Sequence, residues 1–285
     1  MMYNWCFLLL WLLISGCGIT DTFSPVPAYI RLENPKVLTD QSQGASTHKI
    51  KDVWVFQNGQ IIGVYPLPAQ VPLIVDEQDQ EILLLAGIRN NGANDSPAFY
   101  PFYKSIIVKK KFEQLKTENI PLEFSYINQV KFNLIADFEQ VNLFGFDLDE
   151  KPSTGIVLSS EASAAGQKSG KILLNKDYPF IEVATTDRIL KSAGAPGKSY
   201  IEMDYFGEGE IAIGIISYQE GGNTGGLEYK VVLRPQTEWN KVYVEVTELI
   251  NASSLKDYRI ALAFSLPAGK DEGVCYIDNV KLVRF

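Results

Sequence analysis

Alternation of apolar and polar residues over short runs indicates β structure more firmly than any other feature of this chain. In residues 258–266 every second residue is a large apolar one, and the residues between them are arginine, alanine or serine, which places the two kinds on opposite faces of a strand. Residues 241–247 repeat the pattern, so we expect their valines to face a core and Tyr243, Glu245 and Thr247 to face outward. No long stretch has the period of a helix, and only a short helix near residues 247–251 is expected. We therefore predict an all-β fold.

Turn-forming residues separate these runs and indicate one hairpin. Asn58 and Gly59 lie between the β-like runs 52–56 and 60–65, and an Asn-Gly pair tolerates the positive φ angles of a two-residue hairpin turn. Prolines at three positions between residues 66 and 72 exclude a central strand, because proline has no backbone N–H to donate. We expect a β-hairpin here, followed by a loop or an edge strand.

Length and strand spacing predict two domains. A chain of 285 residues is long enough for two ordinary domains, and a fresh set of short strands begins near residue 137. Short strands broken by glycine-rich turns favour a sandwich or a jelly roll. We predict two β-sandwich domains, residues 26–129 and 137–285, joined by a linker at residues 130–136, with the second domain a jelly roll.

The N-terminal segment has the pattern of a lipoprotein signal. An apolar run that begins at Trp5 ends in Ile-Ser-Gly directly before Cys17, and it is far shorter than the ~20 apolar residues of a membrane-spanning helix. We expect residues 1–16 to be a cleaved signal peptide, Cys17 to take up palmitate or a similar acyl chain, and residues 17–25 to tether the protein to a lipid bilayer. The location is then the outer membrane or the cell surface. Residues 1–16 lack the Lys or Arg of an ordinary signal, so a buried apolar N-terminus is the alternative.

Charge, cysteine and histidine content exclude several functions. The chain has 26 Lys plus Arg against 34 Asp plus Glu, a net charge of −8, which repels a phosphate backbone, so we expect no nucleic acid partner. Cys6 lies in the signal and Cys17 carries lipid, which leaves Cys275 as a small core residue without a disulfide partner. His48 is the only histidine, so catalytic triads and multi-histidine metal sites lack parts.

Three pieces of the second half resemble a carbohydrate-binding-module or galactose-binding-like jelly roll. They are the Asp-Phe-Glu triplet at residues 137–139, the Ser-Gly-Lys strand within residues 166–174, and the Tyr-Ile-Asp-Asn-Val sequence within residues 274–282. Trp239 matches a position where the tryptophan of this family packs structurally. The first half is similar to immunoglobulin-like or carboxypeptidase-regulatory-like β domains in surface lipoproteins of Bacteroidota.

The resemblance also implies a structural calcium ion. In this family calcium often joins the first and last strands through a carboxylate near the opening Phe-Glu pair and the aspartate of the closing strand, which here are Glu139 and Asp278. Calcium takes about six to eight oxygen ligands, so such a site staples the two ends of a domain. Carboxylates that are solvated or hydrogen-bonded without a metal are the alternative.

Two acidic clusters are candidates for catalysis. One lies at residues 147–150 and the other consists of Asp204, Glu208 and Glu210. A glycosidase needs two carboxyl groups facing each other across a cleft, whereas acidic residues in a turn such as the one at Gly209 are usually solvated. We expect no catalytic residues and no enzyme activity.

Aromatic residues make up 12% of the chain and supply the surfaces that bind sugars. The C–H face of a sugar stacks on an aromatic ring, and nearby polar side chains bind its hydroxyls. Tyr205, Tyr218, Tyr229 and Tyr243 are the candidate ligand-binding residues, with packing in a core or rim as the alternative for each. The glycine-rich loop at residues 217–226 is a candidate rim of the site.

Three functions are consistent with these features. The first is a lipid-anchored, extracytoplasmic protein that binds glycan without catalysis through its second domain. The second is a structural or assembly lipoprotein that docks a membrane protein partner. The third, and least favoured, is a glycoside-processing enzyme. Exposed aromatic side chains grouped on one sheet favour the first, a sheet without them the second, and two facing carboxylates the third.

Overall fold

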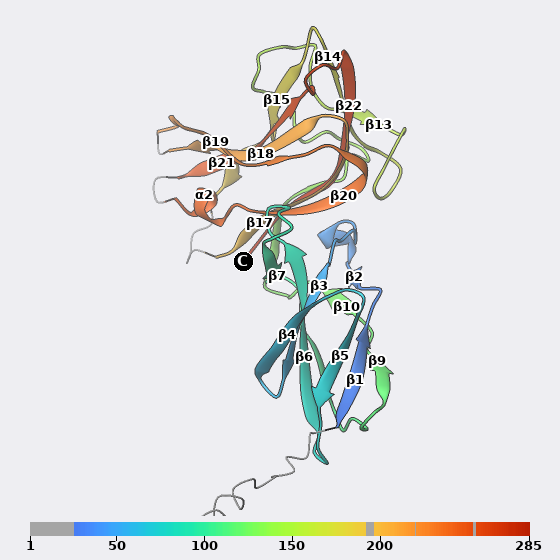
Figure 1. The fold of residues 1–285 in the computed structure, drawn as a ribbon. Coiled ribbons are helices and arrows are strands. Elements are labelled where there is room, and N and C mark those ends of the chain that lie inside the picture. The colour runs from blue at the N-terminus through green and yellow to red at the C-terminus, as the bar shows by residue number, and fades with distance from the viewer. Residues whose placement is uncertain (1–25, 192–196, 220, 253–254) are drawn as a thin grey trace, which may run out of the picture.

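The computed structural model describes residues 26–191, 197–219, 221–252 and 255–285, which fold into two β domains in contact with each other (Figure 1). Cys17, the expected signal peptide and the expected tether up to residue 25 lie outside the described residues. Within the described ranges, no helix is long and apolar enough to cross a membrane. The predicted all-β fold with two sandwich domains is confirmed.

In the N-terminal domain two layers of strands enclose one core. The first layer, which we call the first sheet, has the order β4–β3–β6–β7, with β8 also paired to β6. Its strands are β3 (Asp52–Gln57), β4 (Gln60–Pro66), β6 (Gln80–Arg89), β7 (Pro97–Phe99) and β8 (Ile106–Lys110). The second layer contains β5 (Ala69–Ile74), β1 (Pro27–Leu32) and β9 (Thr117–Asn119), the pair β10 (Glu123–Ser125) and β2 (Lys36–Leu38), and the 3-10 helix η1 (Gln41–Gln43) follows β2. Ile30, Val55 and Leu84 are fully buried between the layers.

Local sequence explains two features of this domain. Asn58 and Gly59 have φ angles of 50° and 79° and form the predicted hairpin turn between β3 and β4. β5, which contains Pro72, lies at the edge of its sheet. An edge position suits a strand with a proline, because one side of the strand needs no N–H donor.

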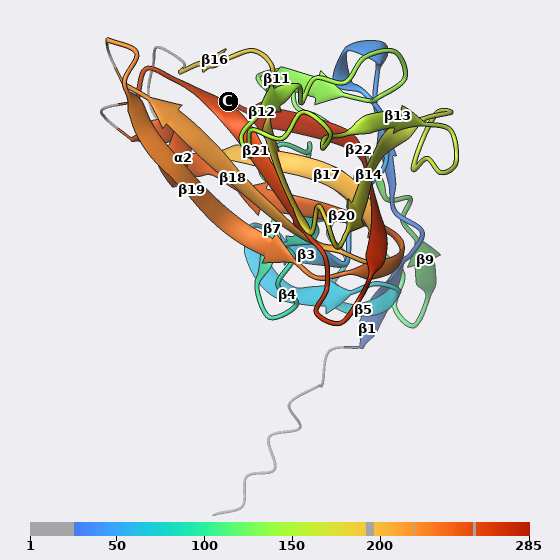
Figure 2. The ribbon, with the colours of Figure 1, turned by 90° about the horizontal axis from the view of Figure 1, so that it is seen from above.

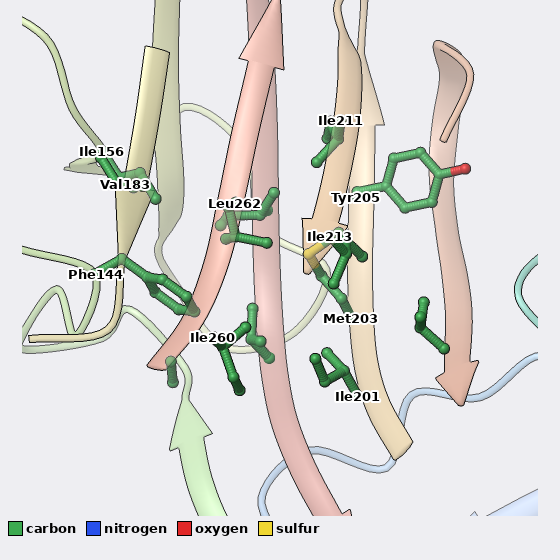
Figure 3. Close-up of a cluster of buried hydrophobic side chains, with 14 of the residues drawn as sticks. Phe144, Ile156, Val183, Ile201, Met203, Tyr205, Ile211, Ile213, Ile260 and Leu262 are labelled. Carbon is green, nitrogen blue, oxygen red and sulfur yellow. The ribbon is translucent and has the colours of Figure 1, made fainter. Parts of the chain in front are cut away.

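The C-terminal domain consists of two sheets packed face to face (Figure 2). The sheet that contacts the N-terminal domain, called the interface sheet, contains β13 (Val157–Ser159), β14 (Ser169–Asn175), β22 (Glu272–Arg284), β17 (Ser199–Gly207) and β20 (Gln236–Glu245) in this order, with β11 (Lys131–Ala136) also paired to β22. The other, called the outer sheet, contains β12 (Phe146–Asp147), β15 (Phe180–Ala184), β21 (Asp257–Ser265), β18 (Glu210–Tyr218) and β19 (Thr224–Leu233), with β16 (Ile189–Leu190) also paired to β21. Side chains such as Phe144, Ile201, Ile213 and Leu262 fill the space between the two sheets (Figure 3). The predicted short helix is present as α2 (Thr247–Asn251).

Strand β20 shows the predicted alternation, but its outward face is covered by the N-terminal domain, which the sequence does not reveal. Val242 and Val244 point into the C-terminal core, as expected. Tyr243 lies on the opposite face but is only 1% exposed, because it packs into the N-terminal core, where its hydroxyl accepts the backbone N–H of Lys49 at 3.1 Å. The outward face of β20 therefore forms part of the domain interface.

Residues 130–136 are not a spacer, which corrects the expectation of a linker. Residues 131–136 form β11, which pairs with β22 of the interface sheet. Phe132 packs against the N-terminal core and Leu134 against the C-terminal core. The apolar side chains of this stretch therefore pack it as a strand against both cores. A flexible linker would instead have mainly polar residues.

A buried carboxylate holds the two domains together. Glu202 of β17 is completely buried, and its Oε1 accepts hydrogen bonds from the hydroxyls of Tyr100 and Tyr126, each at 2.7 Å. Its Oε2 lies 3.3 Å from Nζ of Lys241. Burial by itself raises the pKa of Glu202, but the charges of Lys241 and Lys281 together with the two hydroxyls outweigh burial and lower that pKa. Glu202 is thus an ionised contact shared by both domains.

Candidate functional site

The outer face of the outer sheet gathers two of the four tyrosines singled out in the sequence. Tyr218 and Tyr229 pack there around the fully buried Ala184 and Ala261, apart from the main C-terminal core. We call the group of aromatic and charged side chains on this face the platform. It comprises Phe146, Glu182, Arg188, Tyr218, Tyr229 and Arg259.

Small residues form the floor of the platform. The strand register aligns Tyr229 with Gly214, Gly214 with Ala261, and Ala261 with Ala184. The next position along this row is Phe146 of β12, which pairs with Ala184. A row of one glycine and two alanines leaves room above the sheet for larger side chains from its two ends.

Gly214 is required where β18 meets a bulge of β19. The pairing register shifts between Ile213 and Gly214, and a Cβ atom at Gly214 would lie 2.3 Å from the carbonyl oxygen of Glu228. The bulge supplies one extra residue, so Val231 faces the core while Tyr229 packs on the outer face. Glycine at 214 therefore sets the position of Tyr229.

Tyr229 lies across the small residues. Its hydroxyl donates a hydrogen bond of 2.6 Å to Oε1 of Glu182 on β15, and β18 and β21 lie between β19 and β15 in the sheet. The ring must therefore extend over Gly214 and Ala261, and it is half-buried, with part of its surface open to solvent. Burial and the neighbouring Glu182 raise the pKa of Tyr229, so the hydroxyl keeps its proton and remains a donor.

Arginine side chains order the other half of the platform. The guanidinium carbon of Arg188 lies 3.6 Å from the ring centroid of Tyr218, and that of Arg259 lies 4.2 Å from the ring centroid of Phe146, distances typical of cation–π contacts. Nε of Arg259 donates to the Tyr218 hydroxyl at 3.3 Å and its Nη1 donates to the carbonyl of Thr185 at 2.5 Å. Tyr218 is only 4% exposed, so it supports the arginines and leaves Phe146 and Tyr229 as the accessible rings.

A cavity of about 530 Å³ lies beside the platform. Its lining includes Thr186, Arg188, Leu190 and Arg284. Arg188 borders both the cavity and the platform, and its Nη1 lies 3.4 Å from Oδ1 of Asp257. The cavity thus lies next to Tyr218 and has a mixed lining of polar and apolar side chains.

The two remaining candidate tyrosines lie elsewhere, which corrects their assignment as ligand contacts. Tyr205 is 4% exposed within the C-terminal core, and its hydroxyl accepts from Nδ2 of Asn240 at 3.0 Å. Tyr243 is the buried interface residue described above. Tyr243 was placed outward by alternation, which does not distinguish a solvent face from a face covered by another domain, and Tyr205 has the core packing that was its alternative.

Phe146, Glu182 and Arg188 escaped the sequence analysis because they lie in short strands or loops with weak alternation. One signal was available in β21. The outward residues there are Arg259, Ala261 and Ala263, and small side chains beside an arginine on an outer face leave space for a ligand or for a large neighbour.

The expected calcium ligands hold a loop through backbone amides. Oε1 of Glu139 accepts the N–H groups of Gln167 and Lys168 at 2.7 and 3.1 Å. Oδ2 of Asp278 accepts those of Ala164 and Ala165 at 2.9 and 3.2 Å. Both ends of the domain therefore bind the same loop.

The carboxylates of Glu139 and Asp278 do not fit a cation. Burial raises the pKa of Asp278 to about 7, against the effect of its amide donors. In the part of the chain that the structure describes, no three His, Cys, Asp or Glu side chains gather where they could hold a metal ion. Calcium at Glu139 and Asp278 remains a prediction that this donor set does not support.

The acidic clusters weighed for catalysis have separate surroundings. Asp204 is buried, and its Oδ2 accepts from the Thr47 hydroxyl at 2.5 Å. Glu208 is exposed and pairs with Lys270 at 3.5 Å. Asp149 accepts from Thr154 within its own loop at 3.1 Å. Each carboxylate therefore has a structural or solvated setting.

Comparison with solved structures finds carbohydrate-binding modules. The C-terminal family 22 module of Clostridium thermocellum Xyn10B is similar at 12% identity and a TM-score of 0.36, covering 53% of this chain and 91% of that one. The family 11 module of the cellulase Lic26A-Cel5E of the same organism has 14% identity and a TM-score of 0.40, covering 54% and 95%. A module from a study of promiscuous specificity in the β-sandwich superfamily has 14% identity and a TM-score of 0.37, covering 90% and 98%. No protein-family model and no curated protein matches the chain. At scores and identities this low, the likeness by itself assigns no ligand to this protein.

Proposed function

We propose that this protein is a non-catalytic glycan-binding lipoprotein, anchored through acylated Cys17 at the outer membrane or the cell surface. One observation carries the proposal, namely the half-buried ring of Tyr229 that extends over small residues, with Glu182 at its hydroxyl and Phe146 beside Arg259. An N-terminal immunoglobulin-like domain would hold this platform above the anchor.

The chemistry of the platform suits a sugar. The C–H face of a pyranose stacks on an open aromatic ring, and its hydroxyls bind charged side chains at the edge of that ring. Glu182 accepts hydrogen bonds and Arg259 donates them, so both polarities of a sugar hydroxyl find a partner. A sheet face on which Phe146 and Tyr229 are accessible to solvent leaves room for a sugar chain to extend past them, which suits a polysaccharide.

The platform supports binding better than hydrolysis. Glycoside hydrolysis uses two carboxyl groups on opposite sides of the scissile bond, and the platform as defined contains one, Glu182. That carboxylate accepts a hydrogen bond from the Tyr229 hydroxyl, so its role is to hold the Tyr229 ring in position.

A binding experiment tests the glycan proposal. The chain from residue 18 is run through affinity gels that contain plant and microbial polysaccharides, and any retaining glycan is then titrated calorimetrically. We expect Tyr229→Ala to weaken binding by about tenfold, ~1.4 kcal/mol, because the stacking surface is lost. The control Tyr178→Ala removes a half-buried tyrosine from a turn of the same domain and should leave the affinity unchanged. Retention of the wild type by no polysaccharide contradicts the proposal.

The anchor needs its own test. Cells that express the protein are labelled with palmitate, and we expect label on the wild type and none on Cys17→Ser. An unlabelled wild-type chain in the aqueous fraction contradicts the anchor and leaves the glycan test untouched.

A further inference from the structure

The outer face of the first sheet in the N-terminal domain carries a large apolar surface. Trp54 pairs with Val64 on one side and with Leu85 on the other. Phe56 pairs with Ile61 and Leu83, and Leu83 also pairs with Ile107. With Phe99, whose ring lies edge-on to Trp54 at 6.0 Å, these residues form what we call the apolar face, consisting of Trp54, Phe56, Ile61, Val64, Leu83, Leu85, Phe99 and Ile107.

Solvent reaches this surface in the isolated chain. Ile107 is 59% exposed, Ile61 53% and Phe99 48%. The inward residues of the same strands, such as Val55 and Ile82, are fully buried, so the domain already has its core on the other side of the sheet. A contiguous apolar patch across five strands is rare on a monomeric soluble protein and marks a surface that another body covers.

The border of the apolar face is polar. Glu81 and Lys109 pair beyond Leu83 and Ile107, and both are exposed. At the other end Asp52 and Arg89 form an ion pair beside Phe99. The centre of the face, where Trp54 lies, therefore contains no charged group, while Lys109, a residue type suited to a membrane interface, lies at its edge.

The chain leading to the expected anchor begins beside this face. Pro27, at the start of β1, pairs with Ile74, and the carbonyl of Ile74 accepts a hydrogen bond of 2.5 Å from Nε2 of Gln57. Gln57 directly follows Phe56 of the apolar face. Eight residues separate Cys17 from Val26, a span of at most about 30 Å even when fully extended. An acyl chain on Cys17 thus keeps this end of the domain next to the bilayer.

Further exposed apolar side chains surround the same end. The N–H of Leu115 donates to the carbonyl of Pro27 at 2.8 Å, and Leu115 is 75% exposed and Ile74 66% exposed. Exposure of these apolar side chains to water costs free energy, and they are grouped at the end of the domain where the described chain begins.

We propose that the apolar face docks on the surface of the lipid bilayer and so fixes the orientation of the anchored protein. The geometry rests on the proposed anchor at Cys17, but docking is a separate property of the face. Apolar side chains, including the ring of Trp54, enter the boundary between headgroups and acyl chains, while Lys109 remains at the level of the headgroups. Because the centre of the face is uncharged, the contact needs no anionic lipid and depends only weakly on salt.

Tryptophan fluorescence gives a direct test. Trp5 and Trp11 precede Cys17, so the chain that begins at Cys17 contains only Trp54 and Trp239. Trp54 belongs to the apolar face, whereas Trp239 belongs to the interface sheet of the other domain, where it packs edge-on against Phe206 at 5.0 Å. Trp239→Phe therefore leaves one reporter on the face, and Trp54→Phe leaves one away from it.

Each variant is coupled through the Cys17 thiol to a maleimide lipid in phosphatidylcholine vesicles with brominated acyl chains. This coupling is independent of whether cells acylate Cys17. We expect the emission of Trp54 to shift to the blue and lose most of its intensity to bromine, and the emission of Trp239 to change little. Ile107→Asp in the Trp239→Phe background should restore the intensity of Trp54, because a charge at this exposed position of the face opposes insertion.

Other results overturn docking. Equal quenching of both reporters, or quenching of neither, shows that the face does not select the bilayer. Burial of Trp54 in lipid-free solution that rises with protein concentration, together with dimers in sedimentation, shows that a second copy covers the face instead. None of these outcomes affects the palmitate or glycan experiments, so a failure here is distinguishable from a failure of the proposed function.

Discussion

At the scale of single residues, the structure separates side chains that share a type. Tyr229 extends over Gly214 and Ala261 with an accessible ring, whereas Tyr243 is enclosed between two domains. Alternation placed Tyr243 outward but could not show that another domain covers that face, whereas the outward position of Tyr229 depends on a bulge in β19 that the sequence does not reveal. Contacts between segments that are distant in the sequence determine which face is buried.

Cys275 illustrates a residue whose setting was predictable. Its apolar neighbours predicted a core position, and the structure buries it completely, with the N–H of Gly209 donating to Sγ at 3.2 Å. Burial raises the pKa of the Cys275 thiol to about 11, so on the order of one molecule in a thousand carries the thiolate at pH 8.

We therefore expect Cys275 in the folded chain from residue 18 to react with a disulfide-exchange reagent at pH 8 only as fast as the protein unfolds. In urea the pKa returns to its ordinary range and the thiol should react at once. A fast stoichiometric reaction of the native protein contradicts the burial of this side chain.

At the scale of elements, strands and turns with local signals were predictable and those without them were not. The Asn58-Gly59 turn, the edge strand with Pro72 and the helix α2 follow from residues within a few positions of one another. β11 was mistaken for a linker because its partner, β22, lies at the other end of the chain. Only part of the platform was predicted, for the same reason: Glu182 contacts Tyr229 across two intervening strands, so the two residues are distant in the sequence.

The loop held by Glu139 and Asp278 gives a prediction about metal dependence. Because backbone N–H groups occupy Glu139 Oε1 and Asp278 Oδ2, we expect neither EDTA nor added calcium to change the Tm. Glu139→Ala should lower the free energy of unfolding by about 1 kcal/mol, since two amides lose their acceptor. The exposed Asp177 serves as a control, and Asp177→Ala should have little effect. A Tm that rises with calcium in the wild type but not in Glu139→Ala would establish the metal site instead.

At the scale of the whole molecule, two domains share buried groups that neither satisfies alone. The hydroxyls of Tyr100 and Tyr126 reach Glu202 from the N-terminal domain, and Lys241 reaches it from the C-terminal domain. Separation of the domains would leave this carboxylate and its lysine partner without their full set of contacts.

Glu202→Gln tests this coupling. Loss of the charge leaves Asp204 as the one carboxylate beside the buried Lys241 and Lys281 among the contacts of the described residues, and we expect the free energy of unfolding in urea to fall by about 3 kcal/mol. The exposed Glu208 provides the matched control, and Glu208→Gln should change stability by less than about 0.5 kcal/mol. If the two variants are equally stable, the interdomain carboxylate does not hold the domains together.

The same joint determines how the protein would respond to a bound ligand if the anchor and the glycan site are as proposed. Glu202 is hydrogen-bonded from the N-terminal domain and ion-paired within the C-terminal domain, so the contact resists rotation of one domain against the other. A polysaccharide bound at Tyr229 would then transmit its tension through both domains to the acyl chain proposed at Cys17.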